Sequence, residues 1–467
     1  MKTNDLIRLG VSGGEATRLA EEFIRAFIAQ GNDPARLEVE IVSIIANPTA
    51  FFEDELRAPL ARALDRPAFT PRKEPAPWRQ WGEGLEREAV KQMSNACALP
   101  IAVAGALMPD AHVGYGLPIG GVLATDNAVI PYAVGVDIAC RMKLTVYDRK
   151  ANTIAGQRDR LANVIESETR FGIGCQFKQR REHDVMDEDW SVSPVTQRLR
   201  DKAWSQLGTS GSGNHFVEFG AFTVDSERGP ALSLEPGEYL ALLSHSGSRG
   251  TGAQVCDFYS KRAMARQEQL PNELKRLAWL SLAEADGQEY WAAMNLMGHY
   301  AAANHALIHR HIARKLGLAP ILDIENHHNF AWKEIHEIGG ALREVVVHRK
   351  GATPAGVGVL GIIPGSMAAP GYVVSGKASP ASLHSASHGA GRLLSRTKAM
   401  QSFTWSATRQ LLAERGVELL SAGLDEVPGV YKDIHAIMAV QTDLVEVLGR
   451  FDPKLVKMCP AGERAED

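Results

Sequence analysis

The sequence has no long hydrophobic run and no recognisable export signal. No stretch reaches about 18 uninterrupted apolar residues, the length that a membrane-spanning helix needs. Met1 to Gly10 lacks the order of basic and then apolar residues that marks a secretory signal peptide. We therefore expect neither export nor contact with a membrane, and the expected location is cytoplasmic.

Cysteine is scarce, and neither sign of charge dominates. Five cysteines are scattered over 467 residues, an odd number that fits a reducing compartment better than a disulfide framework. The formal net charge of −4 argues against a broadly basic protein that binds nucleic acid without specificity, but it leaves room for a local basic cleft. Hydrophobic residues make up 45% of the chain and charged residues 23%, as in an ordinary globular protein.

The length and one proline-rich segment indicate more than one structural unit. A chain of 467 residues exceeds the usual size of a single core. Prolines and charges cluster after Arg66, so residues 66–80 are expected to form a linker. Before it, residues 1–65 are expected to form a small α/β extension, with a helix in GEATRLAEEFIRAFIAQG and a strand in LEVEIVSII. Residues 81–467 are expected to form the main domain.

The main domain alternates β-rich and helical segments. Short β-branched runs between Gly and Pro predict packed strands from Pro100 to Tyr147, and the runs ILDI, VVVH and YVVS predict further strands. Helices are predicted for five segments: Thr153 to Glu168, Val195 to Leu207, Gln254 to Leu316, Trp405 to Arg415 and Ile434 to Leu448. This order predicts the α/β (α+β) fold class.

Five separated segments place a metal-capable or nucleophilic side chain among glycines or small residues. Glycine allows a positive φ and a close approach to a ligand, so tight loops are expected to hold these side chains. We expect the five segments to form one site. They are VDIAC with Asp137 and Cys140, SGSGNHF with His215, SHSGSRG with His245, ENHHNF with His328, and SHGAGR with His388.

The first three segments have residue types suited to metal and phosphate. A buried carboxylate such as Asp137 is costly unless it is paired or bound to a metal, and the thiolate of Cys140 can bridge two cations. The Gly/Ser turns at His215 and His245, each expected to end a strand, are typical of loops that gather phosphate oxygens. For each segment taken alone, a structural role as a capping aspartate, a buried cysteine or a hydrogen-bonded histidine stays open.

Other histidines fit this site less well. His327 and His328 point in different directions, so we expect only one of them, His328, to be a ligand and the other to support it. His305 and His309 are four residues apart, a spacing that can hold zinc. They lie in an amphipathic helical pattern with no acidic residue between them, and we expect them to be structural.

The segment GAGRLLSR follows His388 directly. If it opens a helix, the helix N-terminus offers free amides to an anion, and Arg392 and Arg396 lie on one face. This arrangement is typical of a phosphate site, although a single GxG pattern is weak evidence.

In order and spacing these segments resemble the signatures of the RtcB family of RNA ligases. The resemblance implies mixed β-sheets surrounded by helices around a central metal cleft. It also implies an enzyme of tRNA splicing or RNA repair that joins RNA 3′-phosphate or 2′,3′-cyclic phosphate ends to 5′-hydroxyl ends. The matching motifs run from Trp81 to Lys457: MPDAHVGYGLPIGG, VGVDIAC, GSGNHFVE, SHSGSRGTG, HHNFAWKE, HRKGAT, IPGSM, SHGAGRLLSR and PGVYKDI.

The resemblance implies a GTP-dependent mechanism at two manganese ions, whereas ligand types alone would favour zinc or cobalt. His388 would attack the α-phosphate of GTP, the GMP would pass to the RNA 3′-phosphate, and the 5′-hydroxyl would displace it. Water would first open a cyclic phosphate. Cys140 would bridge both ions. The other ligands would form two pairs, His215 with His245 and Asp137 with His328.

Further residues take roles by their family positions. One set would bind the nucleotide, with Asn214 at the phosphates and other members around the guanosine; the set comprises Asn214, Glu218, Ser366, Gly389, Ala390, Gly391, Tyr431 and Lys457. A second set offers cations to the RNA phosphates: Arg249, Lys350, Arg392 and Arg396.

The chain also departs from the family pattern. Arg141 stands where the family usually has Gly, and AAPGY at Ala368 to Tyr372 replaces GTxSY, which removes hydroxyls that could bond the nucleotide. The first eighty or so residues match no part of the pattern and could recruit a partner or an RNA. An activating protein could be a partner. Two alternatives to the ligase function stay open: a metal-dependent phosphoesterase that needs no nucleotide, and a non-ligating RNA- or ribosome-associated paralogue.

Overall fold

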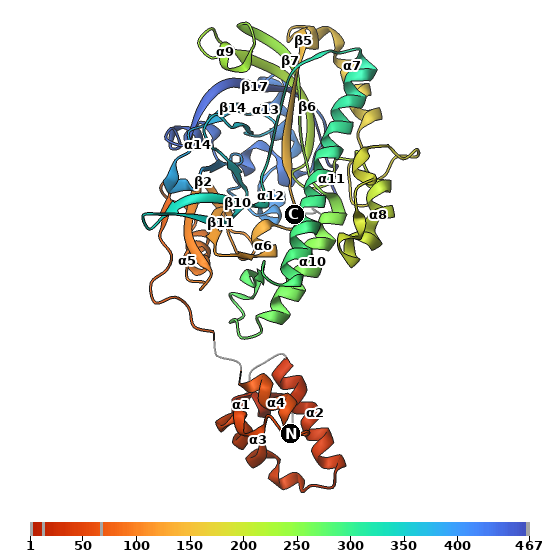
Figure 1. Ribbon diagram of the computed structural model, residues 1–467. Coiled ribbons are helices and arrows are strands. Elements are labelled where there is room, and N and C mark those ends of the chain that lie inside the picture. The colour runs from red at the N-terminus through yellow and green to blue at the C-terminus, as the bar shows by residue number, and fades with distance from the viewer. Residues whose placement is uncertain (1–2, 12–14, 66–68, 464–467) are drawn as a thin grey trace.

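The computed structural model describes residues 3–11, 15–65 and 69–463, and it confirms the α/β (α+β) class (Figure 1). Several β-sheets are surrounded by helices, and a cluster of Asp, Cys and His side chains lies buried among them. None of the helices in these described residues is both long and apolar enough to cross a membrane.

The N-terminal unit is helical, so the strand expected in LEVEIVSII is wrong. That segment forms helix α3, in which Leu37, Ile41 and Ile44 are buried at the i, i+4, i+7 spacing of one helical face. Val39 and Val42 lie on the exposed side, so β-branched composition misled the prediction. The helices are α1 (Thr3–Leu9), α2 (Glu15–Ala29), α3 (Leu37–Ala46) and α4 (Ala58–Leu64).

The main unit begins before residue 81. Strand β1 (Trp78–Gln80) pairs in parallel with β2 (Ala102–His112). The amide of Arg72 donates to the carbonyl of Ala98, and the Arg72 guanidinium donates to the carbonyl of Ala102. The second half of the expected linker, from Arg72 on, is therefore part of the main unit.

A five-stranded sheet forms one layer of the main unit. Its strand order is β1-β2-β3-β11-β10, with β3 at Ile119–Thr125, β11 at Ala341–Lys350 and β10 at Phe330–Ile338. Helix α5 (Arg87–Cys97) packs on β2 through Met93 and Cys97, which are fully buried. This layer carries the motif MPDAHVGYG at the end of β2.

An eight-stranded sheet forms the second layer and curls, because its end strands β13 and β9 contact each other. On β7, Leu240 and Leu242 pack outward against helices, whereas Ala241 and Leu243 pack into the curl, as the two-residue period of a strand requires. Along the sheet the strands are β13 (Leu360–Ile363), β14 (Gly371–Gly376), β17 (Val445–Met458), β6 (Phe216–Val224), β7 (Gly237–Ser246), β5 (Arg141–Lys150) and β9 (Pro320–His327), with β16 (Glu418–Ser421) beside β17.

Helices cover the outer face of this sheet (Figure 1). The predicted helices at residues 153–168 and 195–207 are confirmed as α7 (Thr153–Glu168) and α8 (Pro194–Gln206). The region expected to be helical from Gln254 to Leu316 is two helices, α10 (Arg249–Arg266) and α11 (Ala285–Leu316). A loop containing Pro271 separates them, since proline cannot continue a helical hydrogen-bond ladder.

The C-terminal part closes the domain with short elements. The strands expected in ILDI, VVVH and YVVS are confirmed in β9, β11 and β14, and the helix near Trp405 is confirmed as α13. The last predicted helix ends at Ala439, because the chain from Val445 on joins the sheet as β17. The remaining elements are β4 (Ala128–Val129), α6 (Pro131–Val134), α9 (Gly229–Leu232), β8 (Leu280–Ser281), β12 (Ala352–Pro354), β15 (Ser385–Ser387), α12 (Arg396–Ser402), α13 (Trp405–Glu414) and α14 (Ile434–Ala439).

The helical assignment of α3 can be tested with two matched truncations. Ile41→Ala should lower the free energy of unfolding of the N-terminal unit by about 2–5 kcal/mol, because it empties a fully buried site. Val39→Ala removes a side chain that is 69% exposed and should change it by less than about 0.5 kcal/mol. Thermal unfolding followed by circular dichroism measures both. Equal losses would favour a strand, in which residues 39 and 41 share a face.

Candidate metal centre and nucleotide cavity

Four of the five sequence segments meet at one edge of the eight-stranded sheet. Strands β6, β7, β5 and β9 are neighbours and antiparallel, with Phe216 opposite His245 and Arg141 opposite both Ser246 and His327. The beginning of β6, the end of β7, the beginning of β5 and the end of β9 therefore lie side by side. His215, His245, Cys140 and His328 stand at these four chain positions.

The side chains converge through their metal-binding atoms. Cys140 Sγ lies 3.4 Å from His215 Nε2 and 3.1 Å from His245 Nε2. His215 Nε2 lies 3.0 Å from Asp137 Oδ2, and His245 Nε2 lies 3.2 Å from His328 Nε2. These separations are those expected between neighbouring ligands of one ion at bond lengths of about 2.0–2.3 Å.

Backbone contacts orient two of the histidines. His215 Nδ1 lies 2.8 Å from the carbonyl of Ser210, and His245 Nδ1 lies 3.2 Å from the carbonyl of Asn214. A carbonyl only accepts, so each Nδ1 carries the proton and each Nε2 presents a lone pair to the cluster. Several lone pairs directed at one point repel one another unless a cation lies between them. The donor set therefore fits a metal.

The ligands form two overlapping groups that share the thiol. One group is Asp137, Cys140 and His215, and the other is Cys140, His245 and His328, with every residue buried. The shared role expected of Cys140 fits this geometry. The expected pairing of the remaining ligands is wrong, because His215 lies with Asp137 and His245 lies with His328. Strand order decides this pairing, and spacing along the chain carries no information on it.

Two strained residues hold the loops of Asp137 and His328 together. Ala139 and Asn329 both have positive φ (57° and 65°), a conformation that costs about 1 kcal/mol or more for a residue other than glycine. The Ala139 amide donates to the Asn329 carbonyl at 2.8 Å, and the Gly351 amide donates to Asn329 Oδ1 at 2.8 Å. These bonds stabilise the strained turn beside Cys140.

Burial sets the protonation of the cluster. It lowers the pKa of His245 to about 3 and that of His328 well below its usual value, so both are neutral ligands at pH 7. Burial alone would raise the pKa of Asp137, but its hydrogen bonds and the nearby charge of Arg249 act in the opposite direction, and the pKa is lowered. The Ser248 amide also donates to Asp137 Oδ1 at 3.0 Å. Only glycine fits at position 247, since a Cβ there would lie 2.0 Å from Asp137 Oδ2.

His388 lies beside this cluster and has its own carboxylate. Its ring centroid is 4.9 Å from that of His328. Its Nδ1 lies 2.7 Å from Asp110 Oδ2, which also accepts from the backbone amide of His388 at 3.2 Å. Asp110 is fully buried, and its Oδ1 has no hydrogen-bond partner among the described residues. With Nδ1 donating to Asp110, the Nε2 lone pair of His388 is left for chemistry.

Sequence reasoning missed Asp110. The residue stands in MPDAHVGYG at the end of β2, a motif noted only as part of a resemblance. An acidic residue inside an otherwise buried strand was the available signal, since an unpaired buried carboxylate is costly. Its partner is 278 residues further along the chain, so no local pattern could show the pair.

A cavity of about 610 Å³ contains both the ligand cluster and His388. Tyr431 donates a hydrogen bond to Glu426 at its wall. Burial raises the pKa of Glu218 well above its usual value, which favours the neutral carboxyl form. Seven of the eight residues expected to bind a nucleotide line the cavity: Asn214, Glu218, Ser366, Gly389, Ala390, Gly391 and Tyr431.

Lys457 is the exception, because the alternation of β17 turns it away. Val456 and Met458 line the cavity, and Lys457 points to the other face of the strand. There its Nζ donates to Glu166 Oε2 at 2.5 Å. The prediction that Lys457 lies around the nucleotide is therefore wrong.

The four expected RNA-phosphate cations differ in position. Lys350 lines the cavity, its Nζ donates to the Tyr115 carbonyl at 2.5 Å, and burial lowers its pKa to about 7. Arg249 is 1% exposed, donates to Thr209 Oγ1 and is not among the described residues that line the cavity. It supports the loop before His215, since a Cβ at Gly211 would meet its guanidinium.

Arg392 and Arg396 line the cavity but do not share a helix. Helix α12 begins only at Arg396, and Ser395 is its N-cap. The expectation that GAGRLLSR opens a helix is therefore wrong. Both guanidinium groups pair with Glu426, and Arg396 also bonds Asp425 Oδ2 at 2.7 Å. The buried acid fixes both arginines in the wall.

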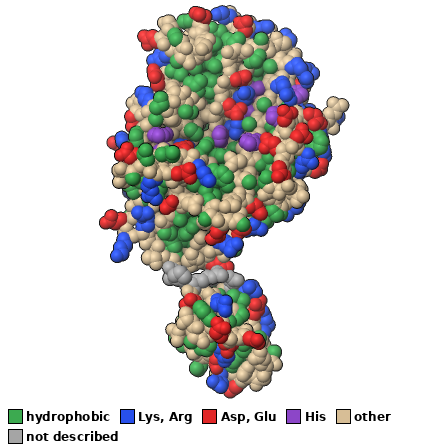
Figure 2. Space-filling view, viewed as in Figure 1, with side chains coloured by type: hydrophobic (Ala, Val, Ile, Leu, Met, Phe, Trp, Pro, Cys, Tyr) green, Lys and Arg blue, Asp and Glu red, His purple; other side chains and the backbone are tan. Residues whose placement is uncertain are grey.

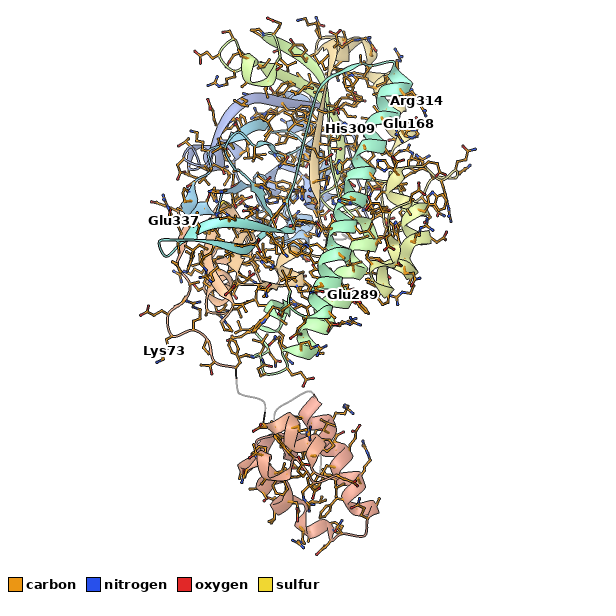
Figure 3. All side chains as sticks on the ribbon, viewed as in Figure 1. Lys73, Glu168, Glu289, His309, Arg314 and Glu337 are labelled. Atoms are coloured by element: carbon orange, nitrogen blue, oxygen red, sulfur yellow. The ribbon has the colours of Figure 1, made fainter. Side chains whose placement is uncertain are left out.

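The histidines expected to be structural are structural. His305 Nδ1 and His309 Nε2 lie 2.6 Å and 2.8 Å from Ser244 Oγ, and they hold β7 against α11 next to His245. Figure 3 labels His309 on α11. His327 packs against Trp332 with ring centroids 5.0 Å apart, outside both ligand groups. Arg141, where the chain departs from the family pattern, also points away from the cavity. Its guanidinium pairs with Glu325 and donates to the Gly298 carbonyl at 3.0 Å.

Fold and site together define a protein with a candidate two-ion Cys/His/Asp centre at the edge of a curled antiparallel sheet. A family profile described as tRNA-splicing ligase RtcB matches residues 92–458. The chain belongs to the RtcB family, as its motifs suggested.

Relatives in that family are similar over most of their length. RNA-splicing ligase RtcB of Escherichia coli strain K12 is 33% identical over 418 residues, which cover 80% of this chain and 95% of the relative. tRNA-splicing ligase RtcB of Methanococcus maripaludis is 31% identical over 448 residues, covering 81% and 92%. RNA-splicing ligase RtcB of Mycobacterium tuberculosis is 32% identical over 429 residues, covering 78% and 98%.

Metal counting tests the shared thiol. Wild-type protein dialysed against Mn²⁺ should retain two equivalents, one for each ligand group. Cys140→Ala should lose both, whereas His328→Ala and Asp137→Ala should each lose one. His327→Ala is the matched control and should keep both, because its ring lies outside the groups. Plasma mass spectrometry after gel filtration gives the count. Loss of only one equivalent from Cys140→Ala would show that the thiol is not shared.

Proposed function

We propose that this protein is an RNA ligase that joins RNA 3′-phosphate or 2′,3′-cyclic phosphate ends to 5′-hydroxyl ends, with GTP as nucleotide donor and two Mn²⁺ ions. The coarser proposal of an RNA ligase rests on family membership and on relatives named as RNA-splicing and tRNA-splicing ligases. The proposed tasks are tRNA splicing or RNA repair.

One observation carries the chemical proposal: a buried carboxylate holds a histidine beside a metal-type cluster. Asp110 accepts from His388 Nδ1 at 2.7 Å, which leaves Nε2 as an unprotonated nucleophile in the cavity. His388 itself belongs to neither of the two ligand groups. The Asp110 carboxylate also stabilises the positive charge that the ring acquires when Nε2 forms a bond.

The cavity residues define the proposed nucleotide site. The Gly389 to Gly391 turn brings backbone amides close to the ligand, and Gly391 has a φ of 75° and no room for a side chain beside Asp110. Glu218, whose pKa burial raises, and Tyr431, held by Glu426, offer polar groups inside the cavity. The volume of about 610 Å³ is within the usual range of small-molecule sites.

The two ligand groups would supply the metal chemistry. Divalent ions held by Cys140 and its four partners would neutralise phosphate charge at the reacting groups. The donor set alone suits zinc or cobalt, so manganese rests on the family resemblance. Neutral His245 and His328 remain ligands at pH 7 because burial suppresses their protonation.

The proposed sequence of steps balances at each bond. His388 Nε2 attacks the α-phosphorus of GTP, the bond to the β-phosphate oxygen breaks, and pyrophosphate leaves. The RNA 3′-phosphate oxygen then attacks the same phosphorus and releases His388. The 5′-hydroxyl attacks the 3′-phosphate, loses its proton and displaces GMP. Lys350, Arg392 and Arg396 line the cavity where these phosphates would lie.

Covalent labelling tests this mechanism. Protein incubated with α-³²P-GTP and Mn²⁺ should retain label on a denaturing gel, and His388→Ala should abolish it. Asp110→Asn keeps the shape but removes the charge and should slow labelling by roughly 100-fold or more.

The matched control for labelling is Lys457→Met, whose side chain lies outside the cavity and should leave the rate unchanged. Absence of label from wild type under several metals would reject the nucleotidyl step. RNA-end hydrolysis without GTP would then favour a phosphoesterase, and RNA binding without any turnover would favour a non-ligating paralogue.

A further inference from the structure

A second cavity, of about 470 Å³, adjoins the one that holds His388. Its walls are α5 and the chain from Met264 to Leu277, and both lie at the lower end of the main unit in Figure 1. Gly114 lines both cavities, and the next residue, Tyr115, lines the first. The short turn from Val113 to Gly116 therefore contributes residues to the walls of both cavities.

This turn is held rigid by contacts on every side. Gln92 Nε2 donates to the Gly114 carbonyl at 2.6 Å, and the Gly114 amide donates back to Gln92 Oε1 at 3.0 Å. Lys350 Nζ donates to the Tyr115 carbonyl at 2.5 Å. Gly116 has a φ of 75° and lies so close to Arg276 that a Cβ would be 2.6 Å from its carbonyl oxygen.

The rigid turn presents an aromatic ring to solvent. Tyr115 is 50% exposed, although its backbone is fixed from both sides. The guanidinium of Arg276, which lines the second cavity, lies 4.4 Å from the ring centroid. An exposed ring on a fixed backbone loses little conformational entropy when a flat ligand stacks on it.

Charged side chains of both signs line the second cavity. Lys91, Lys275 and Arg276 line it together with Glu88 and Glu273, so three positive groups meet two negative ones. The whole chain has a formal net charge of −4, and the face shown in Figure 2 mixes both signs among its described side chains. The charged groups of the second cavity therefore sum to one net positive charge, in a protein that is mildly acidic overall.

We infer that the second cavity and the Tyr115–Arg276 stack form a binding subsite for single-stranded RNA next to the end that reacts. An unpaired base would stack on Tyr115 at the shared rim, and the adjoining phosphates would contact Lys91 and Lys275. An aromatic platform beside a basic groove is the combination that binds single strands with little sequence preference. A base inside a duplex is stacked on both faces by its neighbours, so the subsite favours single strands. This inference deepens the proposed ligase function and rests on it.

The decisive measurement is RNA binding by the full-length protein without GTP. The probe is a single-stranded 12-nucleotide RNA with a 5′-hydroxyl, a 3′-phosphate and an internal fluorophore, followed by anisotropy. Tyr115→Ala should weaken binding by about 5- to 150-fold, since stacking on an aromatic ring contributes about 1–3 kcal/mol per base. Tyr115→Phe keeps the ring and should bind within about 2-fold of wild type.

Salt dependence tests the cations separately. The double variant Lys91→Ala, Lys275→Ala should reduce the slope of log K against log salt by about 1.4, because each lost phosphate contact on a single strand removes about 0.7. Arg343→Ala is the matched control. Arg343 is an exposed residue of β11 that pairs with Asp126, and it lies outside both cavities. Circular dichroism of each variant confirms folding.

The outcomes separate this inference from the ligase proposal. Wild-type affinity in Tyr115→Ala, equal losses in Tyr115→Ala and Tyr115→Phe, or an unchanged salt slope in the lysine variant would each overturn the subsite. Covalent labelling with GTP needs no RNA and is run on the same wild-type preparation. Weakened RNA binding by Tyr115→Ala in a protein that takes no label would support the subsite and reject the ligase mechanism. Covalent labelling together with unchanged RNA binding by Tyr115→Ala would support the ligase mechanism and reject the subsite.

Discussion

The antiparallel register of β6, β7, β5 and β9 is the constraint on which the site depends. Because neighbouring strands run in opposite directions, two strand beginnings and two strand ends meet at one edge. His215, Cys140, His245 and His328 occupy these positions, and a one-residue slip of any strand would turn its ligand to the wrong face. The buried faces of Leu242 and its neighbours oppose such a slip, so sheet packing also holds the ligand geometry.

The space beside these strand ends decides how the other loops of the site pack. Gly247 leaves room for Asp137, and the strained pair Ala139 and Asn329 ties two ligand loops together. The five-stranded sheet brings Asp110, at the end of β2, against His388, whereas the candidate ligands lie at the strand ends of the eight-stranded sheet. Lys350, on β11, lines the first cavity and donates a hydrogen bond to the Tyr115 carbonyl.

Much of the site was readable from local pattern, and the errors have physical causes. Segments rich in glycine or small residues pointed to Cys140 and His388, because tight loops favour such residues beside a site. Lys457 was misplaced because strand parity decides which side chain of β17 faces the cavity. The α3 segment was misread because Val and Ile favour strands, whereas its burial repeats at helical spacing. Asp110 was missed because its partner is distant in the chain.

The sequence by itself determined the family, the α/β class, the identities of the five candidate ligands and the candidate nucleophile. These depend on residue types and on motifs, which are local properties of the chain. Only the tertiary structure decided that Asp137 pairs with His215, that Asp110 holds His388, and that Arg141 faces Glu325. Each of these contacts joins residues 78 to 278 positions apart, where strand order and layer packing set the neighbours.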